Sequence, residues 1–124
     1  MMKKKLNNKK GFTLAELLIV VAIIGILVAI SIPIFTSKLG DAKKATDLAN
    51  IRAAKAAAVT AVLGEEDING KYYNAETGKF VEASAKPTPG YGKSKEEVDG
   101  ATNPPEGKVL KATVSGEEVT LTWE

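Results

Sequence analysis

Few residues in this chain could carry out chemistry. The sequence contains no cysteine and no histidine, which excludes disulfides, thiol nucleophiles, imidazole bases and metal sites with nitrogen or sulfur ligands. A serine or threonine hydroxyl therefore has no imidazole beside it to act as its base. We expect a protein that is not an enzyme and that binds no cofactor and no metal.

Two short motifs resemble parts of ligand-binding loops. Gly92-Lys93-Ser94 ends like a phosphate-binding loop, but Pro87 stands where the first glycine of that loop is required. The segment 67–70, with the sequence DING, resembles part of a calcium-binding loop but lacks the glutamate at the required spacing. Neither motif predicts a binding site.

One carboxylate is unusual because of its position in the sequence. Residues 17–37 form an uncharged run of 21 residues, and Glu16 borders this run directly. As an α-helix the run would be about 31 Å long, which matches the hydrocarbon thickness of a bilayer. A carboxylate is costly inside such a helix, although less so near its end, where the helix dipole favours an anion. Glu16 is therefore either tolerated as a helix-end acid or needed for a function.

The charges on either side of the run differ. Five lysines precede residue 11, and subtracting their charge from the net charge of +2 leaves −3 for the rest of the chain. A basic segment before an apolar run keeps that end of a membrane protein in the cytoplasm. Nucleic-acid binding is not predicted, because no basic face follows.

Two interpretations of the N-terminus use only these features. The run could be a simple membrane anchor, or it could belong to a secretory signal peptide with Ala29-Ile30-Ser31 as the cleavage site. Pro33 close behind that site and the length of the apolar run both argue against a signal peptide. Neither interpretation explains Gly11, Phe12 and Glu16.

The sequence GFTLAELLIVVAIIGILVAISIPIF, residues 11–35, resembles the N-terminus of type IV pilins and of their pseudopilin relatives. The resemblance implies that residues 1–11 are a basic leader peptide, which the prepilin peptidase removes by cutting after Gly11. It also implies that Phe12 becomes the N-methylated first residue of the mature chain. Residues 12–37 would then form a hydrophobic helix that lies in the membrane and later in the filament core.

The same resemblance gives a role to Glu16, which matches the acidic fifth residue of mature pilins. It implies that Glu16 pairs with the Phe12 amine of a neighbouring subunit. A lone charge in an apolar core is costly and a pair is far less so, so this pairing would fix the register of assembly. Gly25 and Pro33 match the glycine and proline that loosen the family's helix, and Pro33 also removes one intrahelical hydrogen bond.

Residues 38–64 predict an amphipathic second half of the same helix, with Gly64 as its stop signal. Spacings of three and four residues define one stripe along it, which we name the Leu39–Leu63 stripe: Leu39, Ala42, Thr46, Ala49, Ala53, Ala56, Thr60 and Leu63. An adjoining face carries Leu48, Ile51, Val59 and Val62. We expect one face to hold a sheet, while small residues elsewhere allow neighbouring helices to approach closely.

Residues 65–124 predict a β-sheet region. KVLKATV and VTLTW alternate on either side of a two-residue Gly116-Glu117 turn. That turn sets a register that pairs Val114 with Val119, Ala112 with Leu121 and Leu110 with Trp123. In this register the side chains of all six residues lie on one face. KYYNAETGKFVEA predicts a second hairpin. The expected fold class is α+β, with a long N-terminal helix packed against a three- to four-stranded antiparallel sheet.

Residues 84–107 are rich in proline, glycine and charge and have no periodicity, which predicts an exposed loop that is functional or mobile. By position this loop resembles the variable region of pilins, which a disulfide often closes. The absence of cysteine resembles Gram-positive pilins, and it implies that proline and packing hold the loop.

The sequence therefore predicts a structural subunit, the major pilin, of an extracellular type IV pilus. Before assembly it would be a single-pass membrane protein with a cytoplasmic N-terminus and an outer C-terminal domain. The implied partners are copies of itself, with or without minor pilins, together with the prepilin peptidase and the pilus assembly machinery. Adhesion and twitching motility are roles that the resemblance implies. The alternatives are a pseudopilin of a type II secretion or DNA-uptake apparatus, and a membrane-anchored or secreted binding module.

Overall fold

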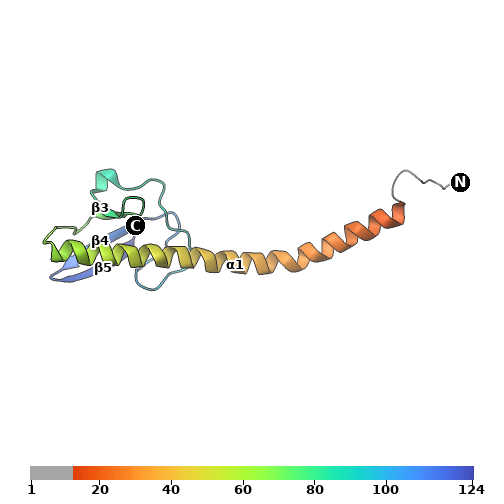
Figure 1. Ribbon diagram of the computed structural model, residues 1–124, viewed down its shortest axis with the longest axis horizontal. Helices are drawn as coiled ribbons and strands as arrows, with labels where there is room; N and C mark the ends of the chain where they lie inside the picture. The colour runs from red at the N-terminus through yellow and green to blue at the C-terminus, as the bar shows by residue number, and fades with distance from the viewer. Residues whose placement is uncertain (1–12) are drawn as a thin grey trace. The chain divides into compact units, whose positions relative to one another are not determined.

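The computed structural model describes residues 13–124 and has an α+β fold, which confirms the predicted fold class. Along the chain, one helix precedes a four-stranded antiparallel sheet (Figure 1). The elements are α1 (Leu14–Leu63), β2 (Tyr72–Asn74), β3 (Lys79–Val81), a short 3-10 helix (Ala83–Ala85), β4 (Leu110–Ser115) and β5 (Glu118–Trp123). The chain divides into two compact units, residues up to Leu39 and Gly40–Glu124.

Both ends of α1 have local causes. At the start, the Thr13 hydroxyl accepts a hydrogen bond of 3.1 Å from the Glu16 N–H, so Thr13 is the N-cap of a Thr-x-x-Glu capping sequence. At the end, Glu65 N–H donates to Val62 O and Glu66 N–H donates to Ala61 O, which is the Schellman pattern. The helix ends before Gly64, as predicted.

The residue with a left-handed backbone conformation at the end of α1 is not Gly64. Glu65 has a φ of 60°, although a side chain at positive φ is strained and glycine is the usual choice there. The stop signal at Gly64 was therefore correct in position, while the conformation that glycine favours falls one residue later.

The sheet has the strand order β3-β2-β4-β5. The β4–β5 hairpin has the predicted register, with Leu110 opposite Trp123, Ala112 opposite Leu121 and Val114 opposite Val119. Its turn depends on Gly116, which has a φ of 64°. The second predicted hairpin is also present, as β2 paired antiparallel with β3.

The β2–β4 contact is short, and side chains extend it at both ends. Only Tyr72 and Lys111 pair directly as strand residues, and just before β2 the backbone of Gly70 and Lys71 bonds to Ala112. On one side, the Asn69 side-chain oxygen accepts the Val114 N–H at 2.9 Å. On the other side, the Tyr91 hydroxyl donates to Tyr73 O at 2.7 Å and accepts the Leu110 N–H at 3.2 Å. Polar side chains thus complete backbone pairing that these short strands cannot supply alone.

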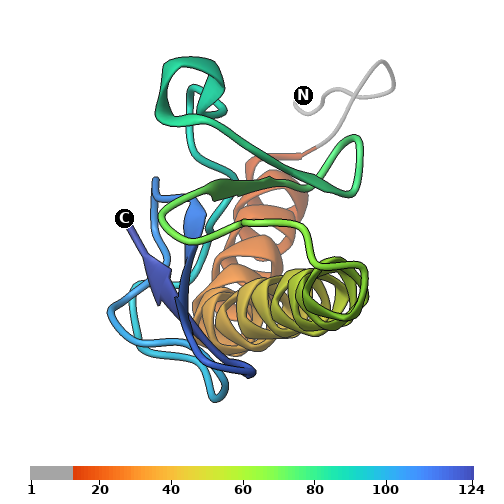
Figure 2. The same cartoon turned by 90° about the vertical axis from the view of Figure 1, so that its left-hand side faces the viewer.

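Within the unit Gly40–Glu124, the sheet covers one face of the helix (Figure 2). The helical residues buried on this face, which we name the buried face, are Asp47, Ile51, Ala54, Ala58 and Ala61. The Leu39–Leu63 stripe lies on the opposite side of the helix, as the 3.6-residue period requires, and all its residues are exposed. Of the adjoining face, Ile51 is buried whereas Val59 is exposed.

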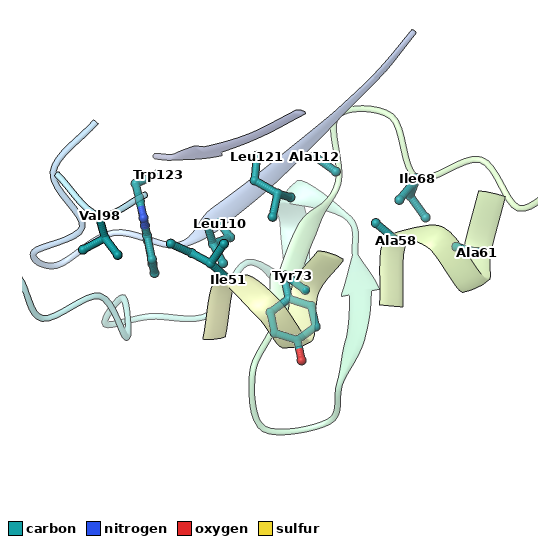
Figure 3. Close-up of a cluster of buried hydrophobic side chains, with 11 residues drawn as sticks. Ile51, Ala58, Ala61, Ile68, Tyr73, Val98, Leu110, Ala112, Leu121 and Trp123 are labelled. Carbon is teal, nitrogen blue, oxygen red and sulfur yellow. The ribbon is translucent and has the colours of Figure 1, made fainter. Parts of the chain in front are cut away.

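The core is small but closely packed. Trp123 and Leu110 are fully buried, and alanines on the helix allow the strands to come close. In Figure 3, Trp123 and Val98 lie at one end of the cluster, and Ala61 lies at the other. The indole N–H of Trp123 has no hydrogen-bond acceptor among the described residues, so its contribution to stability is apolar.

Candidate functional site

The first candidate surface is the apolar part of α1. From Leu17 to Phe35 its large side chains are about half exposed or more, with Phe35 at 67%. This helix is long and apolar enough to cross a membrane, judged by length and composition. Such a continuous apolar surface needs a cover, because soluble proteins rarely expose apolar patches of more than a few hundred Å².

The predicted site residues of this segment lie as follows. Glu16 occupies the first helical turn and is exposed. Gly11 and Phe12, the predicted cleavage and methylation residues, lie outside the described residues 13–124. The sequence interpretation did not identify Thr13 as the N-cap of α1. The Thr-x-x-Glu spacing indicates such a cap.

Gly25 and Pro33, predicted to loosen the helix, both lie within an unbroken α1. A Cβ at Gly25 would meet nothing within 4 Å, so packing within this chain does not require the glycine. Two hydroxyl-bearing residues flank Pro33 in the sequence, and both bond to the preceding helical turn. Ser31 Oγ donates to Leu27 O, and Thr36 Oγ1 donates to Ile32 O. Such bonds to the preceding turn slightly weaken and often bend a helix, but α1 continues through Pro33 without a break.

The second candidate surface is the Leu39–Leu63 stripe. Its two threonines turn their hydroxyls back onto the helix, with Thr46 bonded to Ala42 O at 3.0 Å and Thr60 bonded to Ala56 O at 2.9 Å. Because these hydroxyls are already paired, the stripe presents methyl groups and alanines to its surroundings. Small side chains along most of the stripe would allow a second helix to approach it closely.

The loop 84–107 is ordered by its own backbone. Gly92 N–H donates to Lys108 O, Gly107 N–H donates to Gly92 O, and Glu106 N–H donates to Ser94 O. The two arms of the loop therefore pair with each other. Gly92 is needed because a Cβ there would lie 2.0 Å from Pro105 O.

A carboxylate holds this loop to the helix. Asp47 is fully buried and accepts three backbone hydrogen bonds, two from Lys93 N–H and one from Ser94 N–H. Nearby, an exposed ion pair joins Lys44 to Glu96, and this contact lowers the pKa of Glu96. The prediction that proline and packing hold the loop was incomplete, although Pro105 is indeed buried.

The sequence interpretation also missed Asp47, because the sequence alone does not identify the helix face on which it lies. Asp47 precedes Ile51, Ala54, Ala58 and Ala61 at helical spacing, so it is a charged residue at a core position of the helix. The motif Gly92-Lys93-Ser94, which only resembles the end of a phosphate-binding loop, provides the backbone N–H donors for the Asp47 carboxylate.

Comparisons with known proteins agree with these features. Residues 6–32 match the family described as the prokaryotic N-terminal methylation motif. The type IV major fimbrial protein FimA of Dichelobacter nodosus is 33% identical over 129 residues, covering 91% of this chain and 79% of that protein. Fimbrial protein EcpC of Eikenella corrodens is 28% identical over 130 residues, covering 94% of this chain and 81% of that protein.

Other relatives match only about half of this chain or less. A fimbrial protein of Pseudomonas aeruginosa is 45% identical over 63 residues. That alignment covers 51% of this chain, which spans about two fifths of the length of the Pseudomonas protein. No solved structure matches the chain significantly. The methylation motif at the N-terminus agrees with the match to FimA, which extends over most of that protein. The chain therefore belongs to the type IV fimbrial protein, or pilin, family.

Proposed function

We propose that this chain is the major structural subunit of an extracellular type IV pilus. The observation that carries the proposal is the uncovered apolar helix, since Leu17–Phe35 exposes large apolar side chains along its whole length. A bilayer can cover this surface before assembly, and copies of the same helix can cover it in a filament. The family's name and the methylation motif support the same function.

The Leu39–Leu63 stripe supports self-association of the second half of the helix. It is exposed, and between its end residues Leu39 and Leu63 it is built from alanines and hydroxyl-paired threonines. Small residues let helices approach closely, which increases their van der Waals contact. The principal partner is therefore another copy of this chain, whereas adhesion and motility would be properties of the assembled pilus.

In this proposal the prepilin peptidase cuts after Gly11 and Phe12 is methylated. The five lysines of the leader keep the N-terminus in the cytoplasm, and the sheet region is carried outside. Intact-mass measurement of the surface protein tests the processing. A mature chain that begins near Ile32 would instead indicate an ordinary signal peptidase.

Glu16 has two candidate roles, which the cap geometry makes separable. The observed cap bond uses only the backbone N–H of Glu16, and the capping sequence accepts glutamine at this position as well as glutamate. As the register-fixing partner of a neighbour's Phe12 amine, it must carry a negative charge. Without that charge the amine would stay unpaired in an apolar core, a loss of several kcal/mol for each subunit.

The experiment compares Glu16→Gln and Glu16→Val with the control Thr13→Ala, which weakens the cap by about 1 kcal/mol but keeps the charge. Surface filaments are counted by electron microscopy, and the membrane is blotted for processed subunit. We expect both Glu16 variants to be processed normally but to form few or short filaments, while Thr13→Ala assembles.

Normal filaments from Glu16→Gln would reduce Glu16 to a helix-capping acid and reject the register argument. Wild-type cells whose surface filaments do not contain this chain would reject the pilus subunit itself.

A further inference from the structure

Asp47 is a buried charged side chain that the filament does not explain. Its exposed fraction is 0%, and it faces the loop from the buried face of the helix. Among the ion pairs of the described residues, none involves Asp47. A buried carboxylate without a basic partner is costly unless its oxygens accept several hydrogen bonds.

Backbone N–H groups supply those bonds. Lys93 N–H lies 3.0 Å from Oδ1 and 3.1 Å from Oδ2 of Asp47, and Ser94 N–H lies 2.6 Å from Oδ2. Hydrogen bonds to an ionised acceptor are shorter and about twice as strong as neutral ones. Two successive N–H groups that point at one oxygen also form the concave type of site that binds anions elsewhere.

Contacts that do not involve Asp47 also hold the donors. The Ser94 hydroxyl donates to Glu96 O and accepts the Glu96 N–H, which closes a tight turn. Ser94 O accepts the Glu106 N–H from the other arm, and the backbone at Gly92 is pressed against Pro105. The loop therefore presents its two N–H groups in a fixed geometry that matches a carboxylate.

We propose that the backbone of Lys93 and Ser94 is an anion-binding site whose ligand is the Asp47 carboxylate, and that this contact is the latch anchoring loop 84–107 to the helix. The ligand class is the small carboxylate. The site is filled from within the chain, and it will accept a free carboxylate of similar size when the aspartate is removed.

The test uses the full chain in detergent micelles, with hydrogen–deuterium exchange resolved at the Lys93 and Ser94 amides. In Asp47→Ala these two amides should exchange roughly 10- to 100-fold faster, because hydrogen bonds to a charged group are lost. The Leu121 amide in the sheet should keep its protection. Asp41→Ala is the matched control, since Asp41 is an exposed acid on the same helix.

Chemical rescue separates an anion site from a packing contact. Formate on the order of 100 mM should restore protection at Lys93 and Ser94 in Asp47→Ala, with chloride as the salt control and no effect on wild type. Faster exchange without rescue by formate would reject the anion site. Unchanged exchange in Asp47→Ala would reject the latch.

A second variant covers the case in which Asp47→Ala unfolds and all amides exchange. Asp47→Asn keeps the volume and one acceptor oxygen, so the Lys93 and Ser94 amides should show intermediate protection while Leu121 is unaffected. Full wild-type protection in Asp47→Asn would mean that the charge is not required and would overturn the proposal. Exchange in micelles does not depend on filament formation, so either result leaves the pilus proposal to its own test.

Discussion

Tyr91→Phe tests how the short β2 strand is held to β4. The Tyr91 hydroxyl lies where the next backbone pair after Tyr72–Lys111 would form, and it joins Tyr73 O to Leu110 N–H instead. Phenylalanine keeps the ring and its contact with Trp123, whose centroid lies 5.6 Å away. Only the two hydrogen bonds are removed.

The expected loss follows from the burial of the two partners. Leu110 is fully buried and Tyr73 is 4% exposed, so water does not readily replace the missing hydroxyl. Each lost hydrogen bond contributes about 1 kcal/mol net, and more where a group stays buried and unpaired. We expect the free energy of unfolding to fall by about 2 kcal/mol, which lowers Tm by roughly 10 °C for a domain of this size.

The assay is thermal unfolding of the full chain in detergent micelles, followed by the fluorescence of Trp123, the only tryptophan. The matched control is Tyr72→Phe, because Tyr72 is only partly buried and its ring would keep its contact with Lys86 at 4.8 Å. The control should change stability by less than about 0.5 kcal/mol. A similarly small change in Tyr91→Phe would mean that the hydroxyl does not bridge the strands.

Alkaline pH gives an independent check of the same hydroxyl. Burial raises the pKa of Tyr91 above its ordinary value, although the hydrogen bond from Leu110 N–H lowers it in part. Above pH about 10 the unfolded chain loses this proton while the folded chain keeps it, so the free energy of unfolding decreases as pH rises. Tyr91→Phe has no such proton, and the stability difference from wild type should therefore shrink between pH about 10 and about 12.

Further predictions concern the rest of the unit Gly40–Glu124. A truncated chain that begins at Lys38 should be a folded, soluble monomer by circular dichroism and light scattering, because the buried residues follow that point; an aggregated product would contradict this. Trp123→Ala should lower the free energy of unfolding by about 3–5 kcal/mol in urea titrations, and a near-neutral effect would refute the burial. Gly92→Ala should shift the thermal midpoint down by more than Asp41→Ala does, since its Cβ collides with backbone. Glu65→Gly should raise stability by up to about 1 kcal/mol, because glycine relieves the positive φ, and a loss would argue against that strain.

The β4–β5 hairpin could be predicted residue by residue, because two local signals agree there. The alternation of Leu110, Ala112 and Val114 selects one face, and the Gly116 turn fixes the pairing. A slip of one residue would move every apolar side chain to the wrong face. Local pattern was sufficient because the strands are adjacent in sequence.

The face of the helix that holds the sheet could not be identified in the same way. Ala54 and Ala58 are buried while Ala53 and Ala56 are exposed, so the two sides have the same residue type and periodicity gives no contrast. Only contacts from the distant strands distinguish them. The anchoring of the loop was also hidden, because its donors are backbone N–H groups, which every non-proline residue has.

The loop 84–107 is held to Asp47 by backbone N–H groups and not by side chains. The contact with Asp47 uses the N–H of Lys93, while the side chain of that residue is exposed. Any residue but proline could replace it and still be held in the same place. The exposed side chain at this position can therefore change without changing the attachment of the loop. The chemistry that the loop presents to its surroundings and the contact that holds it to the helix are in this way set by different atoms of the same residue.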